Sequence, residues 1–208
     1  MKRKNLTSLK FSVIVLIIIW SVKIFEIVFD YDFTEYGVLP RKFNGLIGIL
    51  FSPLIHSDVN HLLSNSLPVI VLCLLIFNFY SQIAKKILIY LYFISGLWLW
   101  CIGRESFHIG ASGLIYAMAS FLFFSGILRK NSQLSAVALL VIFIYGGLFW
   151  GLFPIHKNVS WEGHLTGFIA GILVSFIFRK DGPKRKKYNW EIEEDLEVND
   201  NEPNHYIN

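Results

Sequence analysis

The sequence contains few charged residues and only two cysteines. Aspartate, glutamate, lysine and arginine make up 16% of the 208 residues, whereas apolar residues make up 54%. A soluble domain of this length rarely has such a composition. The scarcity of charge therefore argues against a single soluble domain and favours a membrane protein. The net charge of +4 is explained by membrane topology and contact with anionic lipid, and it does not indicate nucleic-acid binding.

The two cysteines are poorly placed for a disulfide. Counted at ~1.5 Å per residue along two helices, Cys73 and Cys101 differ in depth by ~11 Å. That separation exceeds the ~7 Å between Cα atoms that a disulfide tolerates. The sequence therefore predicts no disulfide.

Six apolar runs have about the length needed to cross a bilayer. None alternates apolar and polar residues as barrel strands do, so we expect an all-α membrane protein. The first run follows basic residues but lacks a small-x-small cleavage site, which indicates an uncleaved anchor. The runs are Phe11–Phe29, His61–Tyr80, Ile83–Ile102, Ile109–Leu128, Leu134–Phe153 and Gly163–Phe178.

The distribution of lysine and arginine predicts the orientation of this bundle. With the N-terminus inside, fourteen of the 19 basic residues fall in inner segments and four in outer loops, so both termini are expected in the cytoplasm. Residues 1–10 would be a cytoplasmic N-terminus, 11–179 the six-helix membrane domain with a partly interfacial outer loop at 30–60, and 180–208 a polar, disordered cytoplasmic tail.

Polar residues occur near the outer ends of three runs that cross in the same direction. Counted from the inner ends, Ser112 lies ~26 Å, His164 ~23 Å and Asn65 ~24 Å up its helix. In a ~30 Å hydrocarbon core these residues are at nearly one level below the outer surface. Because unpaired polar groups in lipid cost free energy, we expect them to face one another or a wet cavity. The spacing also puts Tyr116 one turn below Ser112, where its ring would stack on the His164 imidazole.

Small residues indicate which two of these helices pack closely. Gly163, Gly167, Gly171 and Ser175 recur every fourth residue in the last run, and Gly113, Ala117 and Ser120 offer a matching face in the fourth. Such stripes let helix backbones approach each other. A serine and a histidine at the outer ends of the two faces would place a nucleophile beside a base inside a membrane.

The sequence offers no acidic residue to complete a catalytic triad at this depth. No acidic residue lies at the depth of Ser112 in the fourth or sixth run, so a third, acidic triad member is not apparent. Elsewhere in the bundle, Lys23 and Glu26 share a face of the first run. They are expected to form an ion pair that faces either the inside of the bundle or the outer interface. The alternative is that they take part in a proton path.

The chain resembles the rhomboid family of intramembrane serine proteases at these residues. The matching pieces are His56 with His61-x-x-x-Asn65, Gly110-x-Ser112-Gly113-x-x-Tyr116, and Gly163-His164-x-x-Gly167-x-x-x-Gly171. Their order and the six-helix layout fit as well, over about Phe11 to Arg179. The outer segment 30–60 contains no tryptophan, which many rhomboids have there in a Trp-Arg pair.

The resemblance implies a rhomboid-like bundle and a role for each matching residue. Ser112 would be the nucleophile and His164 the general base of a dyad, with Tyr116 orienting the imidazole by stacking. Asn65, His61 and the Ser112 amide would form the oxyanion hole. The glycines Gly113, Gly167 and Gly171 would bring the fourth and sixth helices together. No cofactor or metal is implied.

The implied activity is a serine endopeptidase in a bacterial inner membrane. Its partners would be the lipid bilayer and single-pass membrane proteins, cut within their transmembrane segments near the outer face. Two alternatives remain open. One is a rhomboid-like binding or quality-control protein without catalysis. The other is a membrane metal hydrolase or transporter that uses outer-side histidines, which are His56, His61, His108, His156 and His164.

Overall fold

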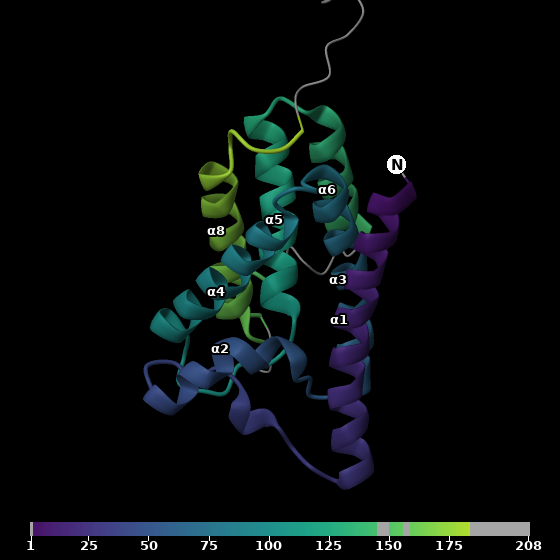
Figure 1. Ribbon diagram of the computed structural model, residues 1–208. Coiled ribbons are helices and arrows are strands. Elements are labelled where there is room, and N and C mark those ends of the chain that lie inside the picture. The colour runs from purple at the N-terminus through teal and green to yellow at the C-terminus, as the bar shows by residue number, and fades with distance from the viewer. Residues whose placement is uncertain (1, 145–149, 156–158, 184–208) are drawn as a thin grey trace, which may run out of the picture.

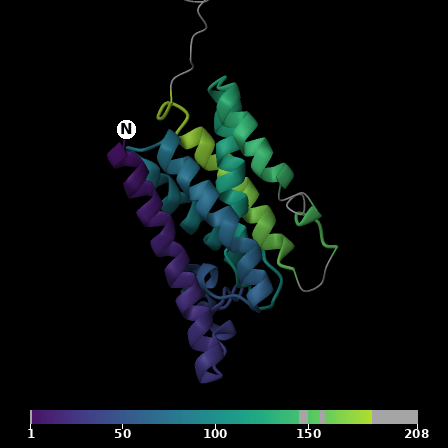
Figure 2. The ribbon, with the colours of Figure 1, turned by 90° about the vertical axis from the view of Figure 1, so that its right-hand side faces the viewer.

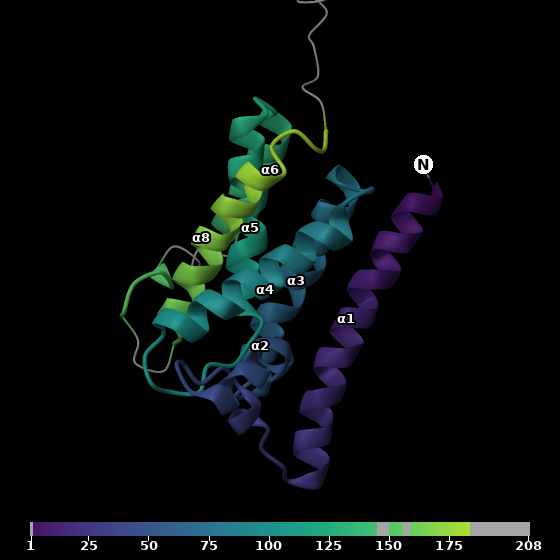
Figure 3. The ribbon, with the colours of Figure 1, turned by 60° about the vertical axis from the view of Figure 1, so that its left-hand side comes forward.

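The computed structural model describes residues 2–144, 150–155 and 159–183. Within these ranges the chain is helical, without strands apart from one antiparallel bridge between Val38 and His108. Figure 1 shows α5 in the middle of the bundle, and Figures 2 and 3 show α1 along its edge beside α3. The α-helices are α1 (Lys2–Phe29), α2 (Gly48–Phe51), α3 (Val59–Phe79), α4 (Ala84–Ile102), α5 (Ser112–Leu128), α6 (Ser132–Ile144) and α8 (Trp161–Ile177).

Each of the six predicted runs overlaps one of the longer helices, although α1, α3, α6 and α8 each begin before their run. Three segments, Ser8–Phe29, α3 and α4, are long and apolar enough to cross a membrane, and α5 and α8 are shorter apolar helices. The fifth run is helical from Ser132 to Ile144, and its residues 145–149 lie outside the described part. These apolar helices confirm the all-α membrane class. Most of the 180–208 segment also lies outside the described residues.

Two helix starts follow from local chemistry. The Asp58 carboxylate caps α3 by accepting a hydrogen bond from the His61 N–H at 2.9 Å, as its residue type predicts. The fourth run becomes helical only at Ser112, later than its apolar residues suggest. The reason is a turn at Gly110, whose φ of +105° is one that L side chains rarely adopt. This turn sets the direction in which α5 begins.

The outer segment between α1 and α3 folds into short helical turns. Besides α2, they are Thr34–Tyr36, Phe43–Ile47 and Ser52–Leu54. The segment is joined to the outer end of α4, since the Arg41 N–H donates to the Trp100 carbonyl at 3.0 Å and the Trp100 indole donates to the Lys42 carbonyl at 2.9 Å. It lies across the end of the bundle at which α5 and α8 begin (Figure 1).

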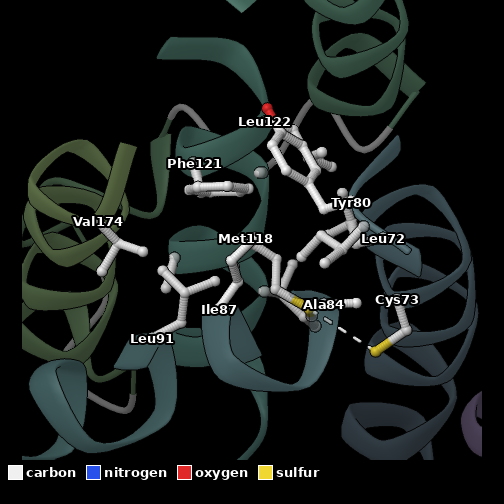
Figure 4. Close-up of a cluster of buried hydrophobic side chains, with 14 of the residues drawn as sticks. Leu72, Cys73, Tyr80, Ala84, Ile87, Leu91, Met118, Phe121, Leu122 and Val174 are labelled. Atoms are coloured by element: carbon white, nitrogen blue, oxygen red, sulfur yellow. Dashed lines mark hydrogen bonds between the residues drawn. The ribbon is translucent and has the colours of Figure 1, made fainter. Parts of the chain in front are cut away.

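The hydrophobic core surrounds α5, which is buried on nearly every side. Met118 and Phe121 of α5 pack against Leu72 of α3 and Leu91 of α4 (Figure 4). Cys73 also lies here, with its thiol 3.8 Å from the Met118 sulfur. Both cysteines are free, Cys73 buried and Cys101 exposed. A helix that is apolar all round is expected at the centre of a bundle.

Candidate active site

Ser112 and His164 meet at the outer ends of α5 and α8. The Ser112 Oγ lies 2.8 Å from the His164 Nε2 although 52 residues separate them. The His164 side chain is buried, with 8% of its surface exposed. A hydroxyl and an imidazole within hydrogen-bond distance are the minimum arrangement for an activated serine nucleophile.

The other ring nitrogen of His164 fixes which tautomer is present. The His164 Nδ1 lies 2.8 Å from the carbonyl oxygen of Gly151. A carbonyl can only accept, so Nδ1 carries the hydrogen and Nε2 of the neutral ring has a free lone pair. That lone pair accepts the Ser112 hydroxyl proton. The Gly151 carbonyl therefore occupies the place that a carboxylate has in a Ser-His-Asp triad.

Stacking on Tyr116 holds the plane of the same imidazole. The Tyr116 and His164 ring centroids are 4.3 Å apart, and the ring planes differ by 12°. Tyr116 follows Ser112 by one helical turn, so a single helix presents both the hydroxyl and the stacking ring. A Cβ at Gly151 would come within 3.0 Å of the Tyr116 hydroxyl and the His164 Nδ1, which leaves room only for glycine.

The close approach of α5 and α8 depends on their small residues. A Cβ at Gly167 would come within 3.0 Å of the Gly113 carbonyl, and one at Gly171 would meet the Ala117 carbonyl equally closely. The predicted small face of α8 thus lies directly against the small face of α5. A Cβ at Gly113 would lie 3.1 Å from the Gly163 carbonyl, next to the serine and histidine. This backbone contact sets the distance between the two side chains.

His56 supports the turn that precedes Ser112. Its side chain is 1% exposed, and its Nε2 accepts a hydrogen bond from the Ala111 N–H at 3.4 Å. Burial, with a smaller contribution from the neighbouring His61, lowers the pKa of His56 to about 4, so the ring is neutral near pH 7 and its Nε2 is able to accept. His56 therefore positions the backbone one residue before Ser112.

His61 lies beside the same turn but is bonded to a different partner. Its ring packs on His56 with centroids 5.0 Å apart, and a Cβ at Gly110 would come within 3.0 Å of it. Ser57 donates to the Asp58 carboxylate at 2.7 Å, so its oxygen accepts from the His61 Nδ1 at 3.2 Å. The neutral His61 ring then has no hydrogen on Nε2, and it would donate to an oxyanion only as imidazolium.

Asn65 lies one turn further along α3. Its amide nitrogen donates to the His61 carbonyl at 2.9 Å, which uses one of its two hydrogens. The side chain is buried. The Asn65 amide is thus held by its own helix.

His108 stabilises the segments from which α5 and α8 begin. Its Nε2–H donates to the Arg104 carbonyl at 3.0 Å, so its Nδ1 accepts from the Ser160 hydroxyl at 2.6 Å. Burial lowers the pKa of His108, which favours the neutral ring that this arrangement needs. Ser160 in turn caps α8 by accepting from the Gly163 N–H at 3.2 Å. The helix that carries His164 is therefore anchored to the segment leading into Ser112.

A cavity opens beside Ser112 between the outer segment, α4 and the starts of α5 and α8. Polar side chains that line it include Ser52, Ser95, His108 and Ser160, and the rest of the lining is largely apolar. Ser112 therefore lies at the edge of this cavity, whereas His164 is buried.

The histidines near the start of α3, α5 and α8 do not form a cluster of metal ligands in the described part of the chain. In the described ranges, no three His, Cys, Asp or Glu side chains lie together as the ligands of one ion would. His156 lies outside those ranges. His56, His108 and His164 each use a ring nitrogen in a contact with protein.

A comparison with protein families identifies the family to which the chain belongs. The Rhomboid domain family matches residues 44–181, which is more than half of the chain. The chain belongs to the rhomboid family. This confirms the resemblance found in the sequence, and it makes the protein a member of an intramembrane protease family with an apolar helical membrane domain.

The curated relatives of this rhomboid are mycobacterial. Uncharacterized proteins of Mycobacterium bovis and Mycobacterium tuberculosis are each 34% identical over 160 residues, which covers 72% of this chain and 65% of theirs. An uncharacterized protein of Mycobacterium leprae is 29% identical over 182 residues, covering 81% of this chain and 70% of its own. The chain therefore spans just under two thirds of the length of the first relatives.

Two positions at the site have no clear sequence signal. Gly151 lies near the end of the fifth apolar run and acts through its carbonyl, which every residue has, so only its position in space shows its importance. His108 resembles any loop histidine until its partner Ser160 is known. Ser160 itself has a weak signal, because a serine three residues before the glycine stripe is a typical helix cap.

Proposed function

We propose that this rhomboid is a serine endopeptidase that cuts transmembrane segments of membrane proteins through a Ser112–His164 dyad. One observation carries the proposal: the His164 Nε2 lies 2.8 Å from the Ser112 Oγ while its Nδ1–H is held by the Gly151 carbonyl. The tautomer that removes a serine proton is thus already present. A scaffold that only binds membrane proteins has no need of this tautomer.

The reaction is an acyl transfer in two halves. The Ser112 Oγ attacks a peptide carbonyl carbon, and its proton passes to the His164 Nε2. The imidazolium then protonates the leaving amine as the C–N bond breaks, which leaves an ester on Ser112. Water attacks this ester, gives a proton to His164 and releases the carboxylic acid. The proton returns to the Ser112 oxygen, and the enzyme is restored.

Backbone and amide donors would stabilise the tetrahedral intermediate. The Ser112 N–H belongs to the first turn of α5, where backbone N–H groups have no partner within the helix. With the second Asn65 N–H it would bind the oxyanion, and removal of one such donor typically lowers the rate ~100- to 1000-fold. His61 would add a third donor when it is protonated.

The membrane setting determines how substrate and water reach the dyad. We infer six spans with both termini in the cytoplasm of a bacterial inner membrane, because the basic residues are concentrated at the inner ends of the helices. A single-pass substrate then enters from the lipid and unwinds near its outer end, because helical backbone is already hydrogen-bonded. The cavity beside Ser112 admits water from the outer face.

Cleavage by purified protein tests this proposal. Wild type is incubated in liposomes with a single-pass membrane protein and compared with Ser112→Ala and His164→Ala. Both variants are expected to lose cleavage, and a fluorophosphonate is expected to label wild type at Ser112, as mass spectrometry would locate. Equal cleavage by either variant contradicts the dyad. Failure of folded wild type both to cleave and to label supports the non-catalytic alternative.

A further inference from the structure

Lys23 holds the chain segment that leads into α3. Its ammonium donates to the His56 carbonyl at 2.9 Å, to the Ser57 carbonyl at 3.0 Å and to the Glu26 carboxylate at 3.0 Å. The three donors of an ammonium are therefore all used. The predicted ion pair with Glu26 is confirmed, and it turns into the bundle: the Lys23 side chain is 12% and the Glu26 side chain 6% exposed.

Glu26 links the Lys23–Glu26 ion pair to the beginning of the outer segment. Its other carboxylate oxygen accepts from the Phe33 N–H at 3.0 Å. The pair is thus bonded both to the start of the outer segment, at Phe33, and to its end, at His56 and Ser57. Burying a charged pair within a spanning helix costs desolvation free energy, which these hydrogen bonds offset.

The carbonyls that Lys23 binds belong to residues next to the proposed dyad. The His56 imidazole accepts from the Ala111 N–H, one residue before Ser112. Ser57 accepts from the His61 ring, and that ring packs on His56 and on the Gly110 turn. Lys23 is therefore two contacts away from the turn that presents the nucleophile.

The charge of Lys23 also suits the chemistry of His56. A protonated Nε2 on His56 would no longer accept from the Ala111 N–H. Burial and then the neighbouring His61 do most to keep the pKa of His56 low. The Lys23 ammonium adds a smaller effect in the same direction, whereas the Leu54 backbone and the Asp58 carboxylate act in the opposite direction. Lys23 thus favours the protonation state in which the support of the Ser112 turn is intact.

We propose that Lys23 of α1, paired with Glu26, is a positioning residue for the dyad, acting through His56 and Ser57 to hold the Ala111–Ser112 backbone in its reactive geometry. This inference rests on the proposed protease function and goes beyond the family match, which begins at residue 44 and leaves α1 outside. It assigns to α1 a part in catalysis as well as in membrane anchoring.

The test compares Lys23→Met with a control that weakens the same helix pair elsewhere. Trp20→Phe removes the hydrogen bond from the Trp20 indole to the Ser66 hydroxyl, another α1–α3 contact, without touching the His56 segment. Because a small misplacement of reacting groups is costly, Lys23→Met is expected to lower kcat about 10- to 100-fold with KM within about 2-fold. Trp20→Phe is expected to keep kcat, even if its Tm falls as much.

Two further measurements keep the test decisive. Lys23→Arg, whose guanidinium also donates to two carbonyls, is expected to restore most of kcat. Amide hydrogen exchange at Ala111 is expected to accelerate in Lys23→Met but not in Trp20→Phe, and this readout does not depend on turnover. If Lys23→Met does not accumulate, Lys23→Gln replaces it and is expected to lower kcat and to accelerate exchange at Ala111 relative to wild type.

The outcomes separate the inference from the proposed function. A Lys23→Met variant with the kcat and Ala111 exchange of wild type overturns the inference while leaving the protease intact. An equal loss of kcat in Trp20→Phe also overturns it, because the effect would then be one of general stability. Cleavage that persists in Ser112→Ala instead removes the dyad itself.

Discussion

At the scale of single residues, the site depends on three groups around one imidazole. The Ser112 hydroxyl, the Gly151 carbonyl and the Tyr116 ring fix the His164 side chain in distance, tautomer and plane. Only two of these groups are side chains. The third is a main-chain atom, so the identity of residue 151 matters through the space that it leaves rather than through its chemistry.

Replacing Gly151 by alanine is expected to lower kcat about 10- to 100-fold, because the new Cβ displaces the imidazole from its reactive position. The closest atom to that Cβ is the Tyr116 hydroxyl, and the His164 Nδ1 follows. Adding Tyr116→Phe removes the closest contact and is expected to restore part of the lost rate. Cleavage kinetics of the two single variants and the double variant measure this. A double variant slower than Gly151→Ala alone would contradict the steric explanation.

At the scale of elements, the distance between the Ser112 hydroxyl and the His164 imidazole is set by the packing of α5 on α8. The glycines Gly167 and Gly171 place the α8 backbone against carbonyls of α5, where no Cβ fits. Because protein interiors are close-packed, the two helix backbones have little freedom to shift relative to each other. The helix pair thus acts as a rigid frame for the two side chains at its outer end.

Gly167→Ala is expected to destabilise the protein by ~1–3 kcal/mol through overpacking. Its Cβ would meet the backbone carbonyl of Gly113, one residue after Ser112, so cleavage should fall together with Tm. Thermal unfolding in detergent and cleavage rates check both effects. Ile169→Ala, at an exposed position on the same helix, serves as the control and should change neither by much. A Gly167→Ala variant as stable as wild type would show that the helices have room to separate.

Much of this frame is predictable from the sequence, and the reasons are physical. Apolar run length gives the helices, and a stripe of small residues shows which faces meet. The capping residue Asp58 marks where α3 begins. The contact between Ser112 and His164 follows from depth counting, because helical rise is constant.

Other features depend on backbone geometry that residue types do not encode. The start of α5 at Ser112 depends on the φ of Gly110, and the His164 tautomer depends on where the Gly151 carbonyl points. The hydrogen bond between His61 and Ser57 is equally hard to predict from the sequence. Its direction follows only from the fact that the Ser57 hydroxyl donates to Asp58. Hydrogen-bond direction is a property of a network, so a pattern of single residues does not reveal it.

At the scale of the whole molecule, the bundle has an end that carries the polar Ser112–His164 contact and an apolar belt. Exposed side chains of α1 such as Ile17, Ile27 and Val28 are suited to contact lipid. At the opposite end of the bundle from the site, Arg129 donates to the Phe178 carbonyl and lies over the Tyr80 ring. The cation there ties α3, α5 and α8 together on the side predicted to face the cytoplasm.

Cysteine labelling tests the predicted orientation. In a chain with Cys73 and Cys101 replaced by alanine, Glu105→Cys lies in the loop between α4 and α5, and Asp181→Cys lies just after α8. A membrane-impermeant maleimide is expected to label position 105 in intact spheroplasts and position 181 only after permeabilisation. The reverse pattern would place the dyad on the cytoplasmic side.

The Gly151 carbonyl has a consequence for how such a base behaves in a bilayer. A carboxylate in that place would bring a permanent negative charge into a region of low dielectric constant, and it would itself titrate. A peptide oxygen supplies a partial dipole and never ionises, so no acid group has to lose its proton before His164 works. Nor does any side-chain deletion remove that oxygen, because it belongs to the main chain of residue 151.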